Sequence, residues 1–298
     1  PTIEELAEKI ETDKTKEKQD FDKLENEYSD ILNDNMIIPK EIENNKVGNV
    51  LLTGATGYLG IHILEKLLEN EEGKVYILIR KEPGMTIEQK LLNKMHYYFG
   101  TKYDKYLGNK IVIFQGDITK DGFGLQQKEL FELGNEVTTI INSAAKVSHY
   151  GDYSSFKNIN VNGTKNIIDF CKHFNKKLYQ ISTLSISGNA FDTGSYMKQT
   201  FEDEIIFREN NFFINQSLDN VYVRSKFEAE KLVLESINDG VDAYILRIGN
   251  LMARLSDGKF QKNVQENAYI NRLLTFMRIK IVPDYLLNGY AEFTPVDS

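Results

Sequence analysis

Tyr222 and Lys226 are the residues whose types and spacing could do acid and base chemistry. They lie one turn apart at the start of a predicted helix, so their side chains share one face. A phenol has a pKa near ~10, too high for good proton transfer at neutral pH, and a neighbouring ammonium lowers that pKa by favouring the phenolate. The pair predicts a catalytic tyrosine with a supporting lysine. An ordinary pair on a helix surface would look the same, so the context must decide.

Hydroxyl groups follow the predicted strand 178–181. Ser182, Thr183 and Ser185 come directly after it, where the chain reaches the carboxyl edge of a sheet. A hydroxyl at that edge could donate a hydrogen bond to the oxygen of a reacting carbonyl. The residue types do not choose among the three.

A glycine-rich turn joins the predicted strand 50–52 to a helix. Gly54 permits the tight turn, Gly57 lets the backbone approach a pyrophosphate, and Gly60 lets helix and strand pack closely. No Gly-Lys-Ser/Thr ending follows, which argues against a P-loop. The turn predicts a dinucleotide site. The residues that we assign to the cofactor here are Gly54, Thr56, Gly57, Tyr58, Leu59 and Gly60.

Arg80 and Lys81 follow the second predicted strand, where an NAD-binding site usually carries an acidic residue for the ribose hydroxyls. A carboxylate would repel a 2′-phosphate, whereas Arg80 would attract it with two parallel hydrogen bonds. We therefore predict NADPH rather than NADH, with Lys81 as a weaker second contact. A solvated strand end is the alternative interpretation.

Two further strand ends complete the predicted cofactor site. Asp117 and Ile118 follow the third strand, and the Asp117 carboxylate could accept a hydrogen bond from the adenine amine or simply cap a turn. After the fourth strand come Ser143, Ala144 and Ala145, whose small side chains would let the dinucleotide lie against the backbone. Tight packing alone could also select small residues there.

Short apolar runs alternate with longer amphipathic stretches from residue 49 onward. The runs at 50–52, 75–79, 111–114, 137–141, 178–181 and 243–246 are typical of strands buried on both faces of a parallel sheet. Helices are predicted over 58–70, 86–99, 153–174 and 222–237. This pattern predicts an α/β fold of the Rossmann type, a doubly wound parallel sheet that binds ligands at the carboxyl edge of its strands.

Composition excludes several classes of function. The net charge of −8 argues against a general nucleic-acid binder. The four histidines and the single cysteine, Cys171, have no metal-ligand spacing, so we expect no metal site, and Cys171 is predicted to be buried in a helix. No apolar run approaches the ~18 residues of a spanning helix, and the first residues lack a signal-peptide pattern. We expect a cytoplasmic protein without a membrane association.

The two ends of the sequence differ from its middle. Residues 1–46 are highly charged, with helical spacing of apolar residues between Phe21 and Leu32, which predicts an amphipathic helix. The nucleotide-binding domain is expected over residues 47–250. The strand and helix alternation stops after Arg247, so residues 251–298 are expected to form part of a smaller C-terminal substrate-binding subdomain.

The glycine turn, Thr183 and the Tyr222/Lys226 pair together resemble the extended short-chain dehydrogenase/reductase family across residues 49–250. The resemblance implies that Thr183 donates a hydrogen bond to the substrate carbonyl, and that Tyr222 and Lys226 contact the cofactor as well as performing catalysis. Asn160 is similar to the asparagine that supports the active-site lysine in that family. A polar residue at a helix start is the alternative for Asn160.

Three later segments narrow the resemblance: 246–251, 256–263 and 293–297 are similar to the thioester reductase domains that end nonribosomal peptide synthetases. Those domains are related to carboxylic acid and aminoadipate reductases. They normally continue past the last of these segments with helices that cap the substrate channel. Residues 1–10 resemble the last helix of a peptidyl carrier protein, and residues 11–46 would then be the linker from carrier to reductase.

This resemblance implies NADPH-dependent release of an acyl, aminoacyl or peptidyl thioester from a phosphopantetheinylated peptidyl carrier protein located upstream. The product would be an aldehyde, or an alcohol after a second reduction. Residues 189–220, which include Phe201, Phe207, Phe212 and Phe213, could gate the acyl chain, or they could form an ordinary structured loop. The alternatives are another extended reductase, such as a nucleotide-sugar epimerase or dehydratase, and a noncatalytic nucleotide-binding domain.

Overall fold

The computed structural model describes residues 47–70, 73–148, 151–188, 209–213, 216–282 and 293–298. The chain divides into two compact units, one of Pro1–Glu43 with Ser187–Leu218 and one of Asn44–Ile186 with Asp219–Ser298. In the first unit the Gln216 side-chain amide donates a hydrogen bond to the carbonyl of Phe212 at 2.8 Å. The predictions for residues 1–46, and for Phe201 and Phe207 in the proposed gate, lie outside the described residues.

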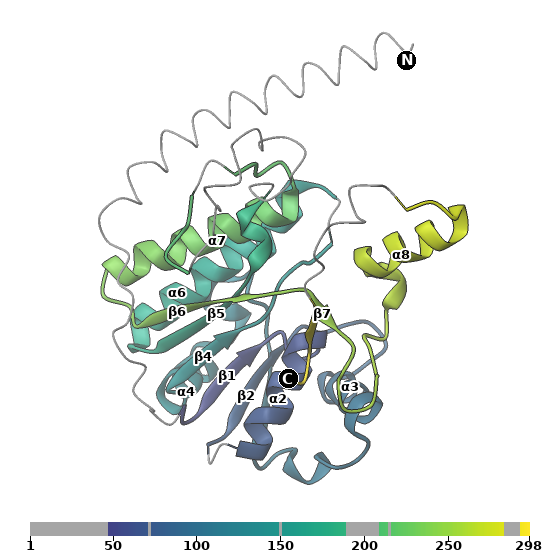
Figure 1. Ribbon diagram of the computed structural model, residues 1–298. Coiled ribbons are helices and arrows are strands. Elements are labelled where there is room, and N and C mark those ends of the chain that lie inside the picture. Colours follow the sequence, from purple (N-terminus) through teal and green to yellow (C-terminus); the bar gives the residue numbers. More distant parts are fainter. Residues whose placement is uncertain (1–46, 71–72, 149–150, 189–208, 214–215, 283–292) are drawn as a thin grey trace. The chain divides into compact units, whose positions relative to one another are not determined.

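A parallel sheet of six strands in the order β3-β2-β1-β4-β5-β6 forms the centre of the second unit (Figure 1). The order reverses between β1 and β4, which creates the crevice where doubly wound sheets bind ligands. The strands are β1 (Val50–Thr53), β2 (Val75–Ile79), β3 (Ile111–Gln115), β4 (Thr139–Asn142), β5 (Lys177–Thr183) and β6 (Ala243–Ile248). The predicted fold class is confirmed.

Helices cover both faces of this sheet (Figure 1). Leu52 and Ile77 pack with α2 and α3 on one face, while Leu51, Ile140 and Leu178 pack with α6 and α7 on the other. Because successive side chains of a strand point to opposite faces, both faces need apolar residues, which explains the continuous apolar runs. The helices that cover the sheet are α2 (Tyr58–Asn70), α3 (Ile87–Phe99), α4 (Gln127–Glu136), α6 (Gly163–Phe174) and α7 (Val221–Asn238).

The predicted helix 153–174 contains a wider turn. It consists of α5 (Tyr153–Phe156), the π-helical turn η3 (Lys157–Asn162) and α6, and the Gly163 amide donates to the carbonyl of Asn158, five residues back. Helix α4 was not among the predicted helices. The short 3-10 turns are η1 (Asp104–Tyr106), η2 (Asp121–Gly124), η4 (Leu184–Ser187) and η5 (Val264–Glu266).

The C-terminal segment adds a small sheet and a helix. Strand β7 (Leu251–Met252) pairs in parallel with β8 (Thr294–Pro295), and α8 (Ala268–Ile279) lies between them in the sequence. The Asp297 carboxylate accepts hydrogen bonds from the Leu255 amide at 2.7 Å and the Ser256 hydroxyl at 2.6 Å. These bonds fix the end of β8 to the turn that follows β7.

Cys171 is buried in α6, as predicted, and burial raises the pKa of its thiol to about 12. Among the described helices, none is long and apolar enough to cross a bilayer. Within the same residues, no group of three or more His, Cys, Asp and Glu side chains could hold a metal ion.

Candidate active site

Two glycines of the turn after β1, Gly54 and Gly60, have no room for a side chain. Gly54 has φ +72°, and a Cβ atom there would lie 2.6 Å from the amide nitrogen of Ala144. A Cβ at Gly60 would lie 2.2 Å from the Gly54 carbonyl oxygen. The backbone of β1, the first turn of α2 and the end of β4 therefore come together more closely than any residue but glycine allows.

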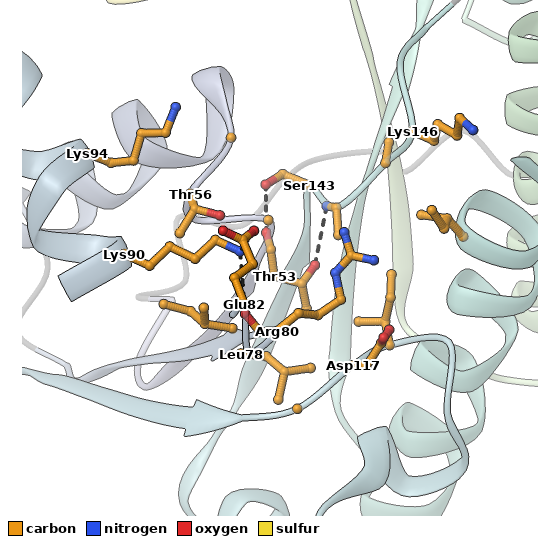
Figure 2. Close-up of a pocket in the computed structure, with 18 of the residues that line it drawn as sticks. Thr53, Thr56, Leu78, Arg80, Glu82, Lys90, Lys94, Asp117, Ser143 and Lys146 are labelled. Carbon is orange, nitrogen blue, oxygen red and sulfur yellow. Dashed lines mark hydrogen bonds and ion pairs between the residues drawn. The ribbon is translucent and has the colours of Figure 1, made fainter. Parts of the chain in front are cut away.

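A cavity of about 590 Å³ opens above this turn, at the carboxyl ends of β1, β2, β3 and β4. Arg80 enters it from the end of β2, and Asp117 lies on the side of β3 (Figure 2). A second hollow of about 470 Å³ includes Arg80 again, together with Lys81. The residues of the predicted cofactor site that line the larger cavity are Gly54, Thr56, Gly57, Arg80, Asp117, Ile118, Ser143, Ala144 and Ala145.

Asp117 stabilises the turn that follows β3. One of its carboxylate oxygens accepts hydrogen bonds from the amide and the hydroxyl of Thr119, both at 2.9 Å. This is the turn role considered from the sequence, and the residue also lines the cavity. Both interpretations of Asp117 therefore have support.

Tyr58, Leu59 and Gly60 lie outside the lining of the larger cavity. The Tyr58 hydroxyl donates a hydrogen bond to the Met252 carbonyl at 2.8 Å, and its ring lies 5.4 Å from that of Phe260. The Tyr58 side chain thus joins α2 to the C-terminal segment. A contact of Tyr58 or Leu59 with a cofactor would come from the backbone at the helix start.

Thr183 and Tyr222 meet at the carboxyl end of β5. The Thr183 hydroxyl lies close enough to the Tyr222 phenol to lower its pKa, and Asn220 caps α7 by accepting a hydrogen bond from the Tyr222 amide at 2.9 Å. Burial raises the pKa of Tyr222, and the neighbouring Thr183 hydroxyl lowers it by a smaller amount. Of the three candidate hydroxyls after β5, that of Thr183 is the one that acts on the pKa of the tyrosine.

Lys226 is buried, with 4% of its surface exposed, and its ammonium donates to the Ile181 carbonyl at 2.7 Å. Burial lowers the pKa of Lys226 to about 8, although Glu230, one turn further along α7, raises it. Glu230 is itself buried and pairs with Arg247 at 2.8 Å. The sequence led us to expect that Lys226 lowers the pKa of Tyr222, but in the structure the group that does so is Thr183.

Asn160 connects the cavity to the helix that carries Tyr222 and Lys226. It is 2% exposed. Its side-chain oxygen accepts a hydrogen bond from the Lys146 backbone amide at 2.7 Å, and its side-chain nitrogen donates one to the Lys146 carbonyl at 3.0 Å. The same side chain donates to the Ser225 hydroxyl at 2.8 Å, and Lys146 lines the cavity. One buried amide therefore ties the cofactor cavity to the residue next to Lys226.

A buried polar ladder supports the three central strands. The Thr53 hydroxyl donates to the Asn142 side-chain oxygen at 2.5 Å, and the Asn142 amide donates to Gln180 at 2.8 Å. Ser143 adds a bond from its hydroxyl to the Thr53 carbonyl at 2.7 Å. These bonds hold the ends of β1, β4 and β5 in register beneath the cavity.

The sequence interpretation missed several cavity residues. Thr53, Lys90, Lys94, Lys146 and Lys262 all line the larger cavity. Lys90 and Lys94 reach in from α3 on the side of Thr56, and Lys146 lies on the far side from Lys94 (Figure 2). Lys90 and Lys94 are one helical turn apart, and this spacing could have indicated that they share one face of α3. No local pattern in the sequence indicates that Lys262 lines the cavity.

An NAD-binding family described as Male sterility protein matches residues 52–298. The chain belongs to this family. Membership is in keeping with the glycine turn and the crevice, and it supports a nicotinamide cofactor. The chain spans only part of the length of the curated relatives that it matches: 23% of a nonribosomal peptide synthetase and 6% of a probable polyketide synthase.

Relatives of the chain include synthetases and synthases. It is 29% identical, over 84% of its length, to the non-canonical nonribosomal peptide synthetase cpsA of Aspergillus campestris. It is 34% identical, over 67% of its length, to the probable polyketide synthase 44 of Dictyostelium discoideum.

Solved structures agree with these relatives. An archaeal thiolation-reductase di-domain of a nonribosomal peptide synthetase is similar with 37% identity and a TM-score of 0.74, over 86% of this chain and 52% of that one. The reductase domain of the aureusimine biosynthetic cluster is similar with 26% identity and a TM-score of 0.69, over 88% of this chain and 65% of that one. The resemblance to reductase domains predicted from the sequence is confirmed.

Proposed function

We propose that the protein uses NADPH to reduce a thioester, carried on the phosphopantetheine arm of a carrier domain, and releases the acyl group as an aldehyde. The observation that carries this proposal is that Thr183 and Tyr222 lie together at the end of β5, one turn from buried Lys226, while Asn160 ties their helix to the dinucleotide cavity. The relatives favour a thioester over other carbonyl substrates, and the archaeal thiolation-reductase di-domain favours a carrier partner.

The residues around the cavity fit a dinucleotide. The close approach of Gly54 and Gly60 to neighbouring backbone leaves a bare surface for a pyrophosphate, and the start of α2 favours its negative charge. Arg80 at the end of β2 favours the 2′-phosphate of NADPH, with Lys81 beside it in the adjoining hollow. NADPH, when bound, supplies the hydride that reduces the carbonyl carbon.

Thr183 and Tyr222 are placed to act on the carbonyl oxygen. Both hydroxyls would donate hydrogen bonds to that oxygen as negative charge develops on it. Because burial raises the pKa of Tyr222, the phenol is protonated at neutral pH and can deliver its proton to the oxygen. The resulting hemithioacetal then returns its hydroxyl proton to the Tyr222 phenolate and loses the pantetheine sulfur as a thiolate, whose conjugate acid has a pKa near ~8.5, so that an aldehyde remains.

Lys226 would hold the ribose next to the nicotinamide and keep Tyr222 in place. Its ammonium is fixed by the Ile181 carbonyl, and its pKa of about 8 leaves it charged at neutral pH. Asn160 would act as a positioning residue, because its bonds reach Ser225 and the backbone of Lys146 rather than the reacting atoms. A second reduction of the aldehyde to an alcohol would use the same groups.

The test is to incubate the protein with NADPH and an acyl-pantetheine thioester, and to follow NADPH absorbance and aldehyde formation. Tyr222→Phe should lower kcat by about 100-fold or more while the protein still binds NADPH. A protein that binds the nucleotide and consumes none of it with any thioester would instead be the noncatalytic alternative. Turnover of a nucleotide sugar without net loss of NADPH would support the epimerase alternative.

Cofactor preference has a separate test. Arg80→Ala should lower the ratio of kcat/KM for NADPH to that for NADH, because the guanidinium favours only the phosphorylated ribose. An unchanged ratio would show that Arg80 is a solvated strand end.

A further inference from the structure

Three lysines form a cluster at one side of the dinucleotide cavity: Lys90 and Lys94 from α3, and Lys262 from the segment after β7. Lys90 lies one turn before Lys94 on the face of α3 that looks into the cavity (Figure 2). Lys262 is distant from both in the sequence and lines the same space. We call these residues the lysine cluster.

The cluster carries more positive charge than its surroundings balance. Lys90 pairs with Glu82, another residue of the cavity lining. Across the described residues, neither Lys94 nor Lys262 makes an ion pair. Burial, followed by the nearby charges of Lys262 and Lys90, lowers the pKa of Lys94, and Glu82 offsets only part of this effect. The ammonium groups of Lys262 and Lys90 therefore both repel that of Lys94. An anion placed between them would remove that repulsion.

Packing fixes the segment that carries Lys262 against the end of α3. The Arg254 guanidinium and the Lys259 ammonium both donate to the Tyr98 carbonyl, at 2.9 and 3.3 Å. In return the Tyr98 hydroxyl donates to the Phe260 carbonyl at 3.4 Å. The Lys262 ammonium lies 5.9 Å from the centre of the Tyr97 ring. Lys262 is thus held beside α3, where it faces the cavity together with Lys94.

We infer that Lys94 and Lys262 bind the 2′-phosphate of NADPH from the side opposite Arg80, so that the C-terminal segment contributes directly to cofactor selection. This inference rests on the proposed use of NADPH. A 2′-phosphate is a dianion with three acceptor oxygens, and several cations from different elements can contact it at once. The pyrophosphate is the other anion of the cofactor, and the helix start at the glycine turn already accounts for it.

The inference has a structural consequence for the segment after β7. Because Lys262 would contact a group that NADH lacks, NADPH should hold residues 254–262 against α3 more firmly than NADH does. Amide hydrogen exchange in these residues should slow with NADPH and remain nearly unchanged with NADH at equal occupancy.

Calorimetric titrations with adenosine 2′,5′-bisphosphate and adenosine 5′-monophosphate test the contact without catalysis. Lys94→Gln and Lys262→Gln should each weaken binding of the bisphosphate by about three- to tenfold, and leave binding of the monophosphate unchanged. The matched control is Lys105→Gln, because Lys105 is exposed and its ammonium lies 5.1 Å from the Tyr106 ring and outside the cavity. It should alter neither affinity.

Each other result overturns the inference. Equally weakened binding of both nucleotides would show that the lysines contact the 5′-phosphate. Unchanged binding in both variants would show that the lysines are solvated and contact neither phosphate. If the unmodified protein itself binds the two nucleotides equally, the NADPH preference in the proposed function fails too. If it discriminates and Lys94→Gln and Lys262→Gln also discriminate, the proposed function stands and only the role of the lysine cluster is lost.

Discussion

Replacement of Lys226 by methionine removes a buried ammonium and keeps a side chain of similar length and volume. The lysine is 4% exposed, and burial lowers its pKa from 10.5 to about 8. A lowered pKa means that the folded protein disfavours the charged form, whereas the unfolded chain does not. The lysine therefore destabilises the fold wherever it is charged, and Lys226→Met removes this cost.

The magnitude and its pH window follow from the two pKa values. The cost is present in full below about pH 8, where Lys226 is charged in both states, and it amounts to about 3 kcal/mol at roughly 1.4 kcal/mol per pKa unit. As the pH rises from about 8 toward 10.5, the folded protein has lost the proton and the unfolded chain still holds it, so the cost declines. Between about pH 7 and about pH 9.5 the stability of the unmodified protein should rise by about 2 kcal/mol relative to the variant.

Urea unfolding of both proteins at about pH 7 and about pH 9.5 measures this change. Other groups that titrate in this range are common to both proteins, so they cancel in the difference. Lys165→Met is the matched control, because Lys165 has 63% of its side chain exposed in a pair with Asp169 and its loss should give no such pH dependence. A difference between Lys226→Met and the unmodified protein that stays constant with pH would refute the burial account of Lys226. The variant should also lose about 100-fold in kcat.

Three other substitutions test separate parts of the site. Asn160→Ala should lower the free energy of unfolding by about 3 kcal/mol in urea titrations, because it leaves the Lys146 amide and carbonyl and the Ser225 hydroxyl without their buried partner. Gly54→Ala should weaken NADPH binding at least about tenfold in fluorescence titrations, because φ is +72° and the new methyl group meets the backbone at the end of β4. Unchanged binding would contradict the close approach of Gly54 to that backbone. Burial raises the pKa of Asp297, but hydrogen bonds from Ser256 and Leu255 outweigh burial and bring the pKa to about 2. The carboxylate therefore contributes about 2 kcal/mol to the free energy of unfolding, which is complete above about pH 4 and is lost as the pH falls toward 2. Asp297→Asn should remove this part of the acid dependence of unfolding, and identical acid transitions would exclude it.

Much of the fold and part of the site could be predicted because their signals are local. The apolar run 75–79 predicts a strand, and the glycine spacing predicts a turn, each within a few residues. The alternation of strands and helices then predicts the parallel sheet. Arg80 could be placed at the cavity because it follows a strand whose end is known. Helix α4 was missed because its N-cap is a glutamine, Gln126, paired with Glu129, rather than the usual Ser, Thr, Asp or Asn.

The rest depends on contacts between distant segments. Residue spacing suggested that Lys226 would act on Tyr222. Spacing does not reveal that the Lys226 ammonium donates to the Ile181 carbonyl, or that Thr183 lies beside the phenol and lowers its pKa. Lys262 could not be placed either, since its position depends on how a loop packs against Tyr98. Such contacts require the three-dimensional arrangement of elements, which the local pattern of one segment does not contain.

The π-helical turn η3 makes the length of its segment as important as its composition. A π turn accommodates one residue more than an α-helix would, and each residue advances an α-helix by about 100°. Deletion of Val161 or Asn162 would let the helix become regular, and it would rotate everything before the deletion, Asn160 included, relative to α6. Asn160 could then no longer reach both Lys146 and Ser225, even with every remaining side chain unchanged. Evolutionary or engineered shortening of this stretch should therefore be far less tolerated than substitution at its exposed positions.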